Sequence, residues 1–287
     1  MTRAGSCLRR GTYPVLLAGL LLSPPDGLEA QSWSTSYSSR QVAGQSELDV
    51  RIRYGAGSVR VSPADPGTLY ELTVEYDEEV ARPLADYTNG RLVAGVESIR
   101  GVGPFRRGGR EGELNLRITQ DIPVDLEAEF GAVRGDLDLG GIHLRRLSLS
   151  TGASDARLRA SAPNPTRMSR AEMRVGAASF QAVELANLNA ERYQVEAGVG
   201  DVTLDFGGSW RGDARADLRI GMGSLEIRIP DDVGVRIHRR TLLTSLDAPG
   251  FRRDGDDLVS ANWDDAEWRL ELHVSAAMGS IRIQHGG

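Results

Sequence analysis

The sequence contains no lysine, a single cysteine and few aromatic residues. All 34 basic residues among the 287 are arginine, and aromatic residues make up 6% of the chain. The absence of lysine excludes enzymes that need a lysine amine: Schiff-base enzymes, P-loop NTPases and enzymes with an S-x-x-K nucleophile pair. The net charge of -6 argues against a nucleic-acid binder, because such proteins normally carry a clear basic excess.

The residue patterns of common catalytic and metal sites are missing as well. Four histidines (His143, His238, His273 and His285) are dispersed, without an H-E-x-x-H motif or an i, i+4 pair. We therefore interpret them as solvent-facing strand residues. No G-x-G-x-x-G or G-x-S-x-G motif occurs, so neither a dinucleotide site nor a hydrolase nucleophile elbow is expected. The sequence thus predicts no catalytic residue, no metal site and no cofactor.

One cluster of acidic residues leaves a metal alternative open. Asp254, Asp256 and Asp257, with Asp264 and Asp265, could supply the oxygen ligands that calcium prefers. The spacing of an EF-hand is absent, because Leu258 occupies the next ligand position. We interpret residues 254–265 as a solvated acidic loop, and calcium binding there stays an alternative.

Long apolar runs are absent except for a short one near the start. Residues 15–22 are apolar, follow a basic segment that ends at Arg10, and precede two prolines. This layout is typical of a secretory signal peptide, and the run is shorter than the roughly 20 residues of a spanning helix. We predict cleavage after Ala30 and an extracytoplasmic protein, periplasmic or secreted. An uncleaved anchor is the alternative.

Glycine, by contrast, is abundant, and it recurs at one position of a repeating pattern. An alternating apolar and polar strand runs into a small-residue corner, and a second alternating strand follows; Leu218, Ile220, Gly221, Gly223 and Leu225 exemplify one copy. Copies recur about every 22 residues. Glycine at a corner permits a positive φ or a close backbone approach. The glycines that we assign to corners are Gly55, Gly57, Gly131, Gly135, Gly152, Gly176, Gly198, Gly200, Gly221, Gly223 and Gly279.

The repeat determines the fold prediction. A single coil cannot bury its apolar row, whereas stacked coils bury a continuous one. We therefore predict an all-β fold: a β-solenoid (β-helix-like) stack of two-strand repeats of about 22 residues, with atypical end caps. An antiparallel sandwich is the alternative. The predicted segments are a signal peptide at 1–30, a flexible linker at 31–47, an N-terminal cap with the first coil at 48–121, and solenoid repeats at 122–283 with a closing insertion at 231–266.

The corner sequences carry a family resemblance. Residues 55–61, 198–204 and 278–283 resemble the toast-rack and putative-adhesin families of bacterial envelope proteins, and residues 251–266 resemble the tail of LiaF-type envelope stress proteins. The resemblance covers most of residues 43–283. It implies a non-enzymatic, solenoid-like protein with a role in adhesion or in the envelope stress response.

Residues and resemblance together predict a non-enzymatic, exported, adhesin-like binding or scaffolding module at the cell envelope. The expected partner is an envelope protein or a surface polysaccharide, recognised by outward rows of arginine, aspartate and glutamate. Two alternatives stay open. One is an accessory protein of envelope-stress signalling, and the other is a glycan-processing β-helix enzyme with carboxylates that converge between adjacent coils.

Overall fold

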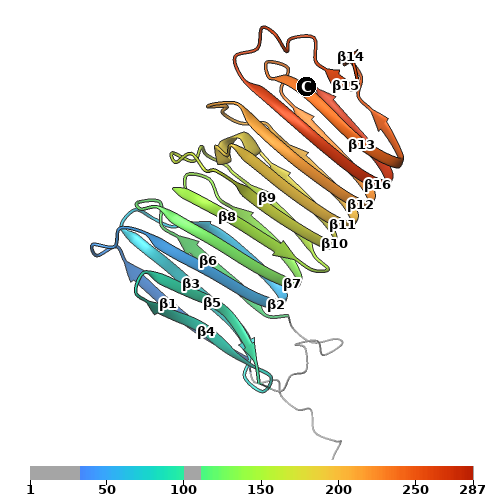
Figure 1. The fold of residues 1–287 in the computed structure, drawn as a ribbon. Helices are drawn as coiled ribbons and strands as arrows, with labels where there is room; N and C mark the ends of the chain where they lie inside the picture. Colours follow the sequence, from blue (N-terminus) through green and yellow to red (C-terminus); the bar gives the residue numbers. More distant parts are fainter. Residues whose placement is uncertain (1–32, 100–110, 287) are drawn as a thin grey trace, which may run out of the picture. The chain divides into compact units, whose positions relative to one another are not determined.

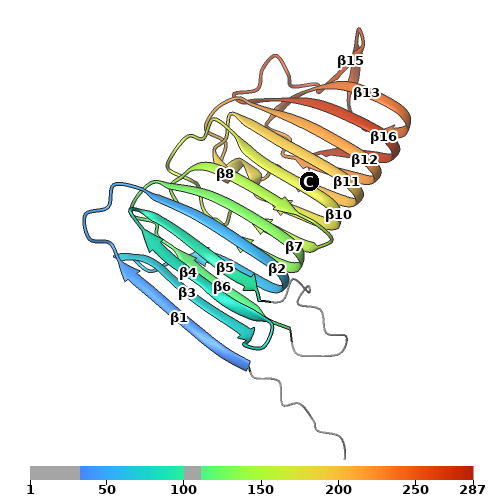
Figure 2. The ribbon, with the colours of Figure 1, turned by 60° about the horizontal axis from the view of Figure 1, so that its bottom comes forward.

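The computed structural model describes residues 33–99 and 111–286, and almost all of its ordered elements are β-strands (Figures 1 and 2). The all-β prediction is confirmed; the described part contains one short 3-10 helix, η1 (Leu185–Leu188). No helix in this part is long and apolar enough to cross a membrane. The predicted signal peptide and Ala30 lie outside the described residues.

The strands are β1 (Trp33–Gln41), β2 (Leu48–Pro63), β3 (Thr68–Asp77), β4 (Ala81–Thr88), β5 (Arg91–Ser98), β6 (Glu113–Ile118), β7 (Val124–Asp138), β8 (Leu144–Thr151), β9 (Asp155–Arg159), β10 (Ala171–Val183), β11 (Arg192–Asp205), β12 (Ala214–Ile229), β13 (Gly234–Asp247), β14 (Arg252–Asp254), β15 (Asp257–Val259) and β16 (Arg269–His285).

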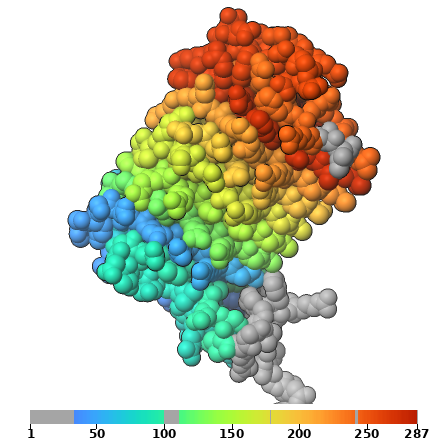
Figure 3. Space-filling model, viewed as in Figure 1, coloured from blue at the N-terminus to red at the C-terminus, as the bar shows by residue number. Residues whose placement is uncertain are grey.

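From β2 onward, successive copies of the repeat lie side by side as parallel strands in register. β2 pairs with β7, β7 with β8 and β9, both of these with β10, and the stack continues through β11 and β12. Equivalent residues of neighbouring copies are therefore adjacent, as Val195, Leu218 and Val274 illustrate. Figure 3 shows the copies as successive bands of colour. The alternation that is visible in the sequence thus becomes continuous rows of side chains.

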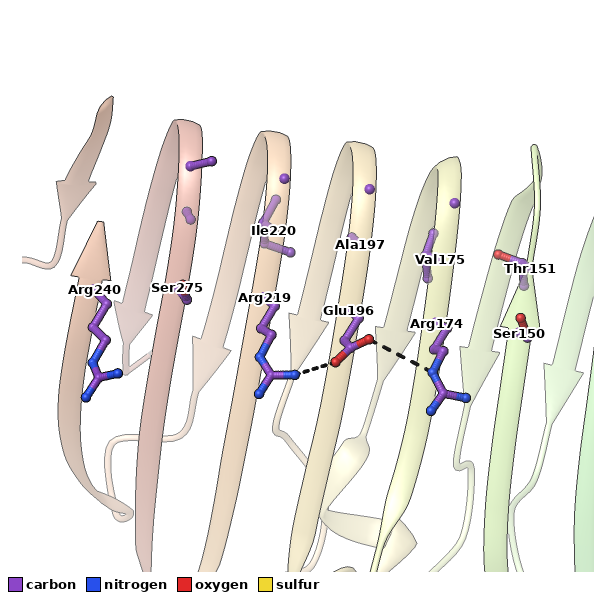
Figure 4. A pocket seen from close by; sticks show the side chains of 15 residues that line it. Ser150, Thr151, Arg174, Val175, Glu196, Ala197, Arg219, Ile220, Arg240 and Ser275 are labelled. Atoms are coloured by element: carbon purple, nitrogen blue, oxygen red, sulfur yellow. Dashed lines mark hydrogen bonds and ion pairs between the residues drawn. The ribbon is translucent and has the colours of Figure 1, made fainter. Parts of the chain in front are cut away.

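Each long strand bends at its small residues, and Figure 4 shows the ribbons turning back above Ala197 and Ile220. The inward side chains on both sides of the bend are buried together. In β12 these include Ala216 and Leu218 before the bend, and Leu225 and Ile227 after it. Full burial of a leucine or isoleucine contributes about 1.5–3 kcal/mol, so the repeated rows supply the main stabilisation of the fold.

Glycines at the bend allow neighbouring copies to approach closely. A Cβ atom on Gly131 would lie 2.2 Å from the carbonyl oxygen of Gly55, and the equivalent glycines of β10, β11 and β12 face the preceding copy in the same way. A second set has positive φ: Gly223, at +133°, would place a Cβ 1.9 Å from the Gly200 oxygen. Neither contact tolerates a side chain, which accounts for the glycine at these positions.

Gly135 does not belong to the bend, so its assignment as a corner was wrong. It pairs in register with Val59 and Ala156, both of which are buried, two residues beyond the bend position that Gly57 shares with Val133. Its φ is not in the left-handed region, and a Cβ would meet its nearest neighbours at an ordinary 3.4 Å. Gly135 therefore occupies an inward position where a larger side chain normally stands.

Antiparallel pairs occur among the first strands, in addition to the parallel pairs that β2 makes with β5 and β6. β1 pairs with β3, β3 with β6, and β4 forms a hairpin with β5. The prediction of a flexible linker at 31–47 was therefore wrong for Trp33–Gln41, which β3 orders through a full antiparallel ladder. The sequence did not indicate this strand, because its side chains are half-buried or exposed and it therefore lacks an apolar row.

The chain order is interrupted at the other end of the stack. The last strand, β16, inserts between β12 and β13, and it pairs in parallel with both. The segment 231–266, expected as a closing insertion, contributes β13 to the parallel stack and adds the short hairpin β14–β15 beside it. Residues 234–247 and 269–282 consequently face each other one for one.

Candidate binding face

The in-register stack aligns outward polar side chains from different copies into rows, with about 4.8 Å between strands. One row lies before the bend on eight neighbouring strands, and we call it the arginine–glutamate row. Its members, in order along the stack, are Arg53, Glu129, Ser150, Arg174, Glu196, Arg219, Ser275 and Arg240. Figure 4 shows the part from Ser150 to Arg240, where these side chains project from the same face.

Glu196 links two arginines of this row. Arg219 Nη1 donates a hydrogen bond to Glu196 Oε1 at 2.6 Å, and Arg174 Nε lies 3.9 Å from Glu196 Oε2. Within residues 33–99 and 111–286, the guanidinium group of Arg240 makes no ion pair or hydrogen bond. Exposed ion pairs contribute only about 0–1 kcal/mol each, so these arginines can exchange their present partners for the anionic groups of a ligand.

A shallow, open depression follows the row towards the bend. Beside the row residues, it is lined by small residues that leave the backbone uncovered, such as Gly176, Gly198, Gly221 and Ala277. Because the depression crosses several strands, it fits an extended ligand that runs along the stack.

An apolar ridge lies one residue beyond Gly198, Gly221 and Ala277, which line this depression. Val199, Met222, Met278 and Leu243 are neighbours in register on β11, β12, β16 and β13. Their exposed fractions are 53%, 48%, 45% and 72%, which is unusual for a contiguous set of large apolar residues. The arginine–glutamate row and the apolar ridge therefore lie three residues apart along the same strands, and we call the strip of surface that they form the binding face.

The structure brings together two of the four histidines. His238 on β13 and His273 on β16 are neighbours in register, and their rings stack with centroids 4.3 Å apart. Our interpretation of isolated, solvent-facing histidines was wrong for this pair, because the rings stack on each other and only 34% of the His238 side chain and 31% of the His273 side chain are exposed. His285 Nε2 is 2.8 Å from the carbonyl oxygen of Val233, away from the pair. Sequence reasoning missed this pair because the two histidines are 35 positions apart and no local pattern indicates that their strands are neighbours.

Burial lowers the pKa of His273, and two neighbouring groups, Arg215 and His238, lower it further. Asp217 and Glu271 oppose this shift. The imidazole of His273 is therefore held towards its neutral form, in which a ring nitrogen can accept a proton or a metal ion.

The acidic loop does not gather its carboxylates around one point. Asp254 and Asp257 face Arg236 at 3.5 and 3.7 Å, whereas Asp264 lies 3.6 Å from Arg252. Asp257 also contacts His238 at 2.8 Å. This geometry favours ion pairs with arginine over a shared calcium ion.

The sequence of this chain matches a known domain family. The sequence model of a family described as the N-terminal domain of toast_rack, DUF2154, matches residues 29–179 and 170–228. No curated protein sequence matches the chain.

Three solved structures are similar to this chain. The crystal structure of a "putative cell adhesion protein" from Clostridium sporogenes has 16% identity, a TM-score of 0.46, and coverage of 88% of this chain and 100% of its own. A "putative adhesin" from Bacteroides fragilis has 10% identity and a TM-score of 0.33, over 87% and 97% of the two chains. One from Parabacteroides merdae has 9% identity and a TM-score of 0.34, over 87% and 95%.

Proposed function

Because the chain belongs to the family of the toast_rack N-terminal domain, we propose that it is a non-enzymatic binding or scaffolding module of the cell envelope. In this proposal the parallel stack is a β-solenoid, and the binding face is its recognition surface. The residues before Trp33 direct export, and the mature protein acts outside the cytoplasm, as an adhesin-like module does.

The arginine–glutamate row is the observation that supports this function most. Arg174 and Arg219 are separated by two strand spacings, and so are Arg219 and Arg240, which places successive guanidinium groups roughly 9–10 Å apart. Guanidinium groups bind carboxylates and phosphates in a planar, bidentate manner. A regular row of them suits a partner whose anionic groups recur along an extended chain.

The apolar ridge adds a second kind of contact on the same strip. A polymer of charged sugars has an anionic edge and less polar ring faces, which correspond to the arginine row and to the ridge around Met222 and Met278. We therefore propose a surface polysaccharide with carboxylate or phosphate groups as the partner. An envelope protein is the other outcome of the test below.

The test measures binding of the exported chain to an array of anionic and neutral polysaccharides and to isolated cell envelopes. The triple variant R174S/R219S/R240S removes the cations of the row. A matched control, R157S/R228S/R282S, removes three arginines of β9, β12 and β16 that lie beyond the bend. Both sets consist of exposed strand arginines, so they change charge and stability by similar amounts.

The proposal predicts binding to anionic polysaccharides that the row variant loses and the control retains. If the wild-type chain still binds envelopes from which the polysaccharide has been removed, the partner is a protein instead. Equal loss in both triple variants would mean that net charge governs binding, and it would contradict recognition by this row. Release of shortened glycans by the wild-type chain would contradict a non-enzymatic role.

A further inference from the structure

A cluster of metal-ligating side chains lies on β16 and β13, where His273 and His238 stand two residues before Ser275 and Arg240 of the arginine–glutamate row. His238, His273 and Glu271 each offer one ligand atom, and these atoms lie within 4.8 Å of one another. We propose that these three residues bind a divalent transition-metal ion of the zinc class. The proposal is independent of the function proposed above.

The residue types match this class of ion. Two imidazoles and one carboxylate form a ligand set that zinc accepts, and three protein ligands leave one position for water or another ligand. Zinc holds nitrogen and oxygen at about 2.0–2.2 Å in a tetrahedron, which places its ligand atoms about 3.3 Å apart. The three side chains must close by roughly 1.5 Å at most, which rotations of partly exposed side chains can supply.

Asp257 prepares His238 for this role. His238 Nδ1 and Asp257 Oδ1 are 2.8 Å apart, so the carboxylate accepts a hydrogen bond from the protonated Nδ1. This bond fixes the tautomer in which Nε2 carries a lone pair. A carboxylate that orients a ligating histidine through its other ring nitrogen is a regular feature of zinc sites.

The unpartnered ring nitrogen of His273 also indicates a bound metal ion. Its Nε2 atom is buried and has no hydrogen-bond partner among the described residues, and the nearest carboxylate oxygen, on Glu271, is 3.9 Å away. A buried polar atom without a partner costs about 1–3 kcal/mol. Coordination of a metal ion by Nε2 removes this cost.

Charges around the cluster come from both neighbouring strands and from β15. Arg215 and Asp217 of β12 pair in register with Glu271 and His273, and they bond to each other at 3.1 Å. Arg236 of β13 faces Glu271 and is held by two aspartates and by the ring of Trp263. Because each arginine already has a carboxylate partner, its repulsion of a bound cation is reduced.

The experiment titrates Zn²⁺ into the exported chain, produced without a histidine tag, by calorimetry and equilibrium dialysis. Co²⁺ serves as a spectroscopic substitute that reports a tetrahedral site. The variants are H273A, E271Q and D257N. The matched control is H143A, whose histidine precedes β8 on another part of the stack. Circular dichroism establishes that each variant is folded, and E271Q removes a ligand with the least change of shape.

The proposal predicts one Zn²⁺ per chain. We expect D257N to weaken binding about 10- to 100-fold, because it removes the group that orients His238, and H273A and E271Q to weaken it at least as much. H143A should bind as the wild type does. Failure of the folded wild-type chain to bind Zn²⁺ at millimolar concentration would overturn the proposal, and so would equal weakening in H143A and H273A.

Discussion

The close approach of neighbouring copies at the bend makes Gly223→Ala a sensitive perturbation. The new Cβ would lie 1.9 Å from the Gly200 carbonyl oxygen, whereas real contacts of this kind lie beyond about 3.0 Å, so β12 must move by about 1 Å from β11. The backbone at φ +133° also disfavours any side chain, at about 1–2 kcal/mol. Displacement of the strand weakens hydrogen bonds that are worth about 1–3 kcal/mol when left unsatisfied. We therefore expect a loss of about 2–5 kcal/mol.

Substitutions at two other glycines separate the cost of a positive φ from the cost of the close contact between copies. Gly250→Ala introduces a side chain at φ +85°, but nothing lies within 4 Å of the new Cβ, so only the backbone cost of about 1–2 kcal/mol applies. Gly135→Ala has neither a positive φ nor a contact shorter than 3.4 Å. We expect it to stabilise the fold by about 0.5 kcal/mol, because alanine reduces the entropy of the unfolded chain.

Urea unfolding followed by circular dichroism measures these changes, and the m-value shows whether unfolding stays cooperative. The expected order of stability is Gly135→Ala, wild type, Gly250→Ala and Gly223→Ala, from highest to lowest. If Gly223→Ala costs no more than Gly250→Ala, the copies do not approach each other as closely as this structure shows, and the explanation of the glycine pattern fails.

Because the tyrosines Tyr54 and Tyr193 are buried, we expect the free energy of unfolding to fall at alkaline pH. Burial raises the pKa of Tyr54, helped by Glu113, Glu111 and Glu75, and burial likewise raises the pKa of Tyr193. The unfolded chain releases both protons near pH 10, whereas the folded chain retains them, so the free energy of unfolding should fall above that pH by about 1.4 kcal/mol per pH unit for each tyrosine. Tyr54→Phe and Tyr193→Phe should each reduce this slope in denaturant titrations between pH 9 and 11, and a slope that neither variant changes would refute the reasoning.

The sequence was sufficient for the repeat and for the rows that it creates. Alternation around Leu218 and Ile220 predicted which side chains are buried, because a strand has a period of two and each copy has the same phase. The small residues at the bend were also visible, because close backbone contacts allow little else. Gly135 was misassigned because a glycine within a buried row looks the same in the sequence as a glycine at a bend.

The pairing partners of the last strands could not be predicted. β13 follows β12 in the chain, yet β16 separates them, and only this order places His273 beside His238. Residues that are 35 positions apart become neighbours through a register that no local pattern encodes. β1 was missed for a related reason, since its ladder with β3 depends on backbone hydrogen bonds more than on apolar side chains.

The order of the last strands supports both the arginine–glutamate row and the histidine cluster, and cysteine cross-linking tests it most directly. In a Cys7→Ser background, cysteine pairs at 219 and 275, at 275 and 240, and at 219 and 240 are treated with a linker that spans one strand spacing but not two. The structure predicts that the first two pairs are joined, and that the third is not, because its residues lie about 9–10 Å apart across β16. Efficient joining of 219 to 240, without joining of either to 275, would show that β13 lies directly beside β12 and would contradict the account.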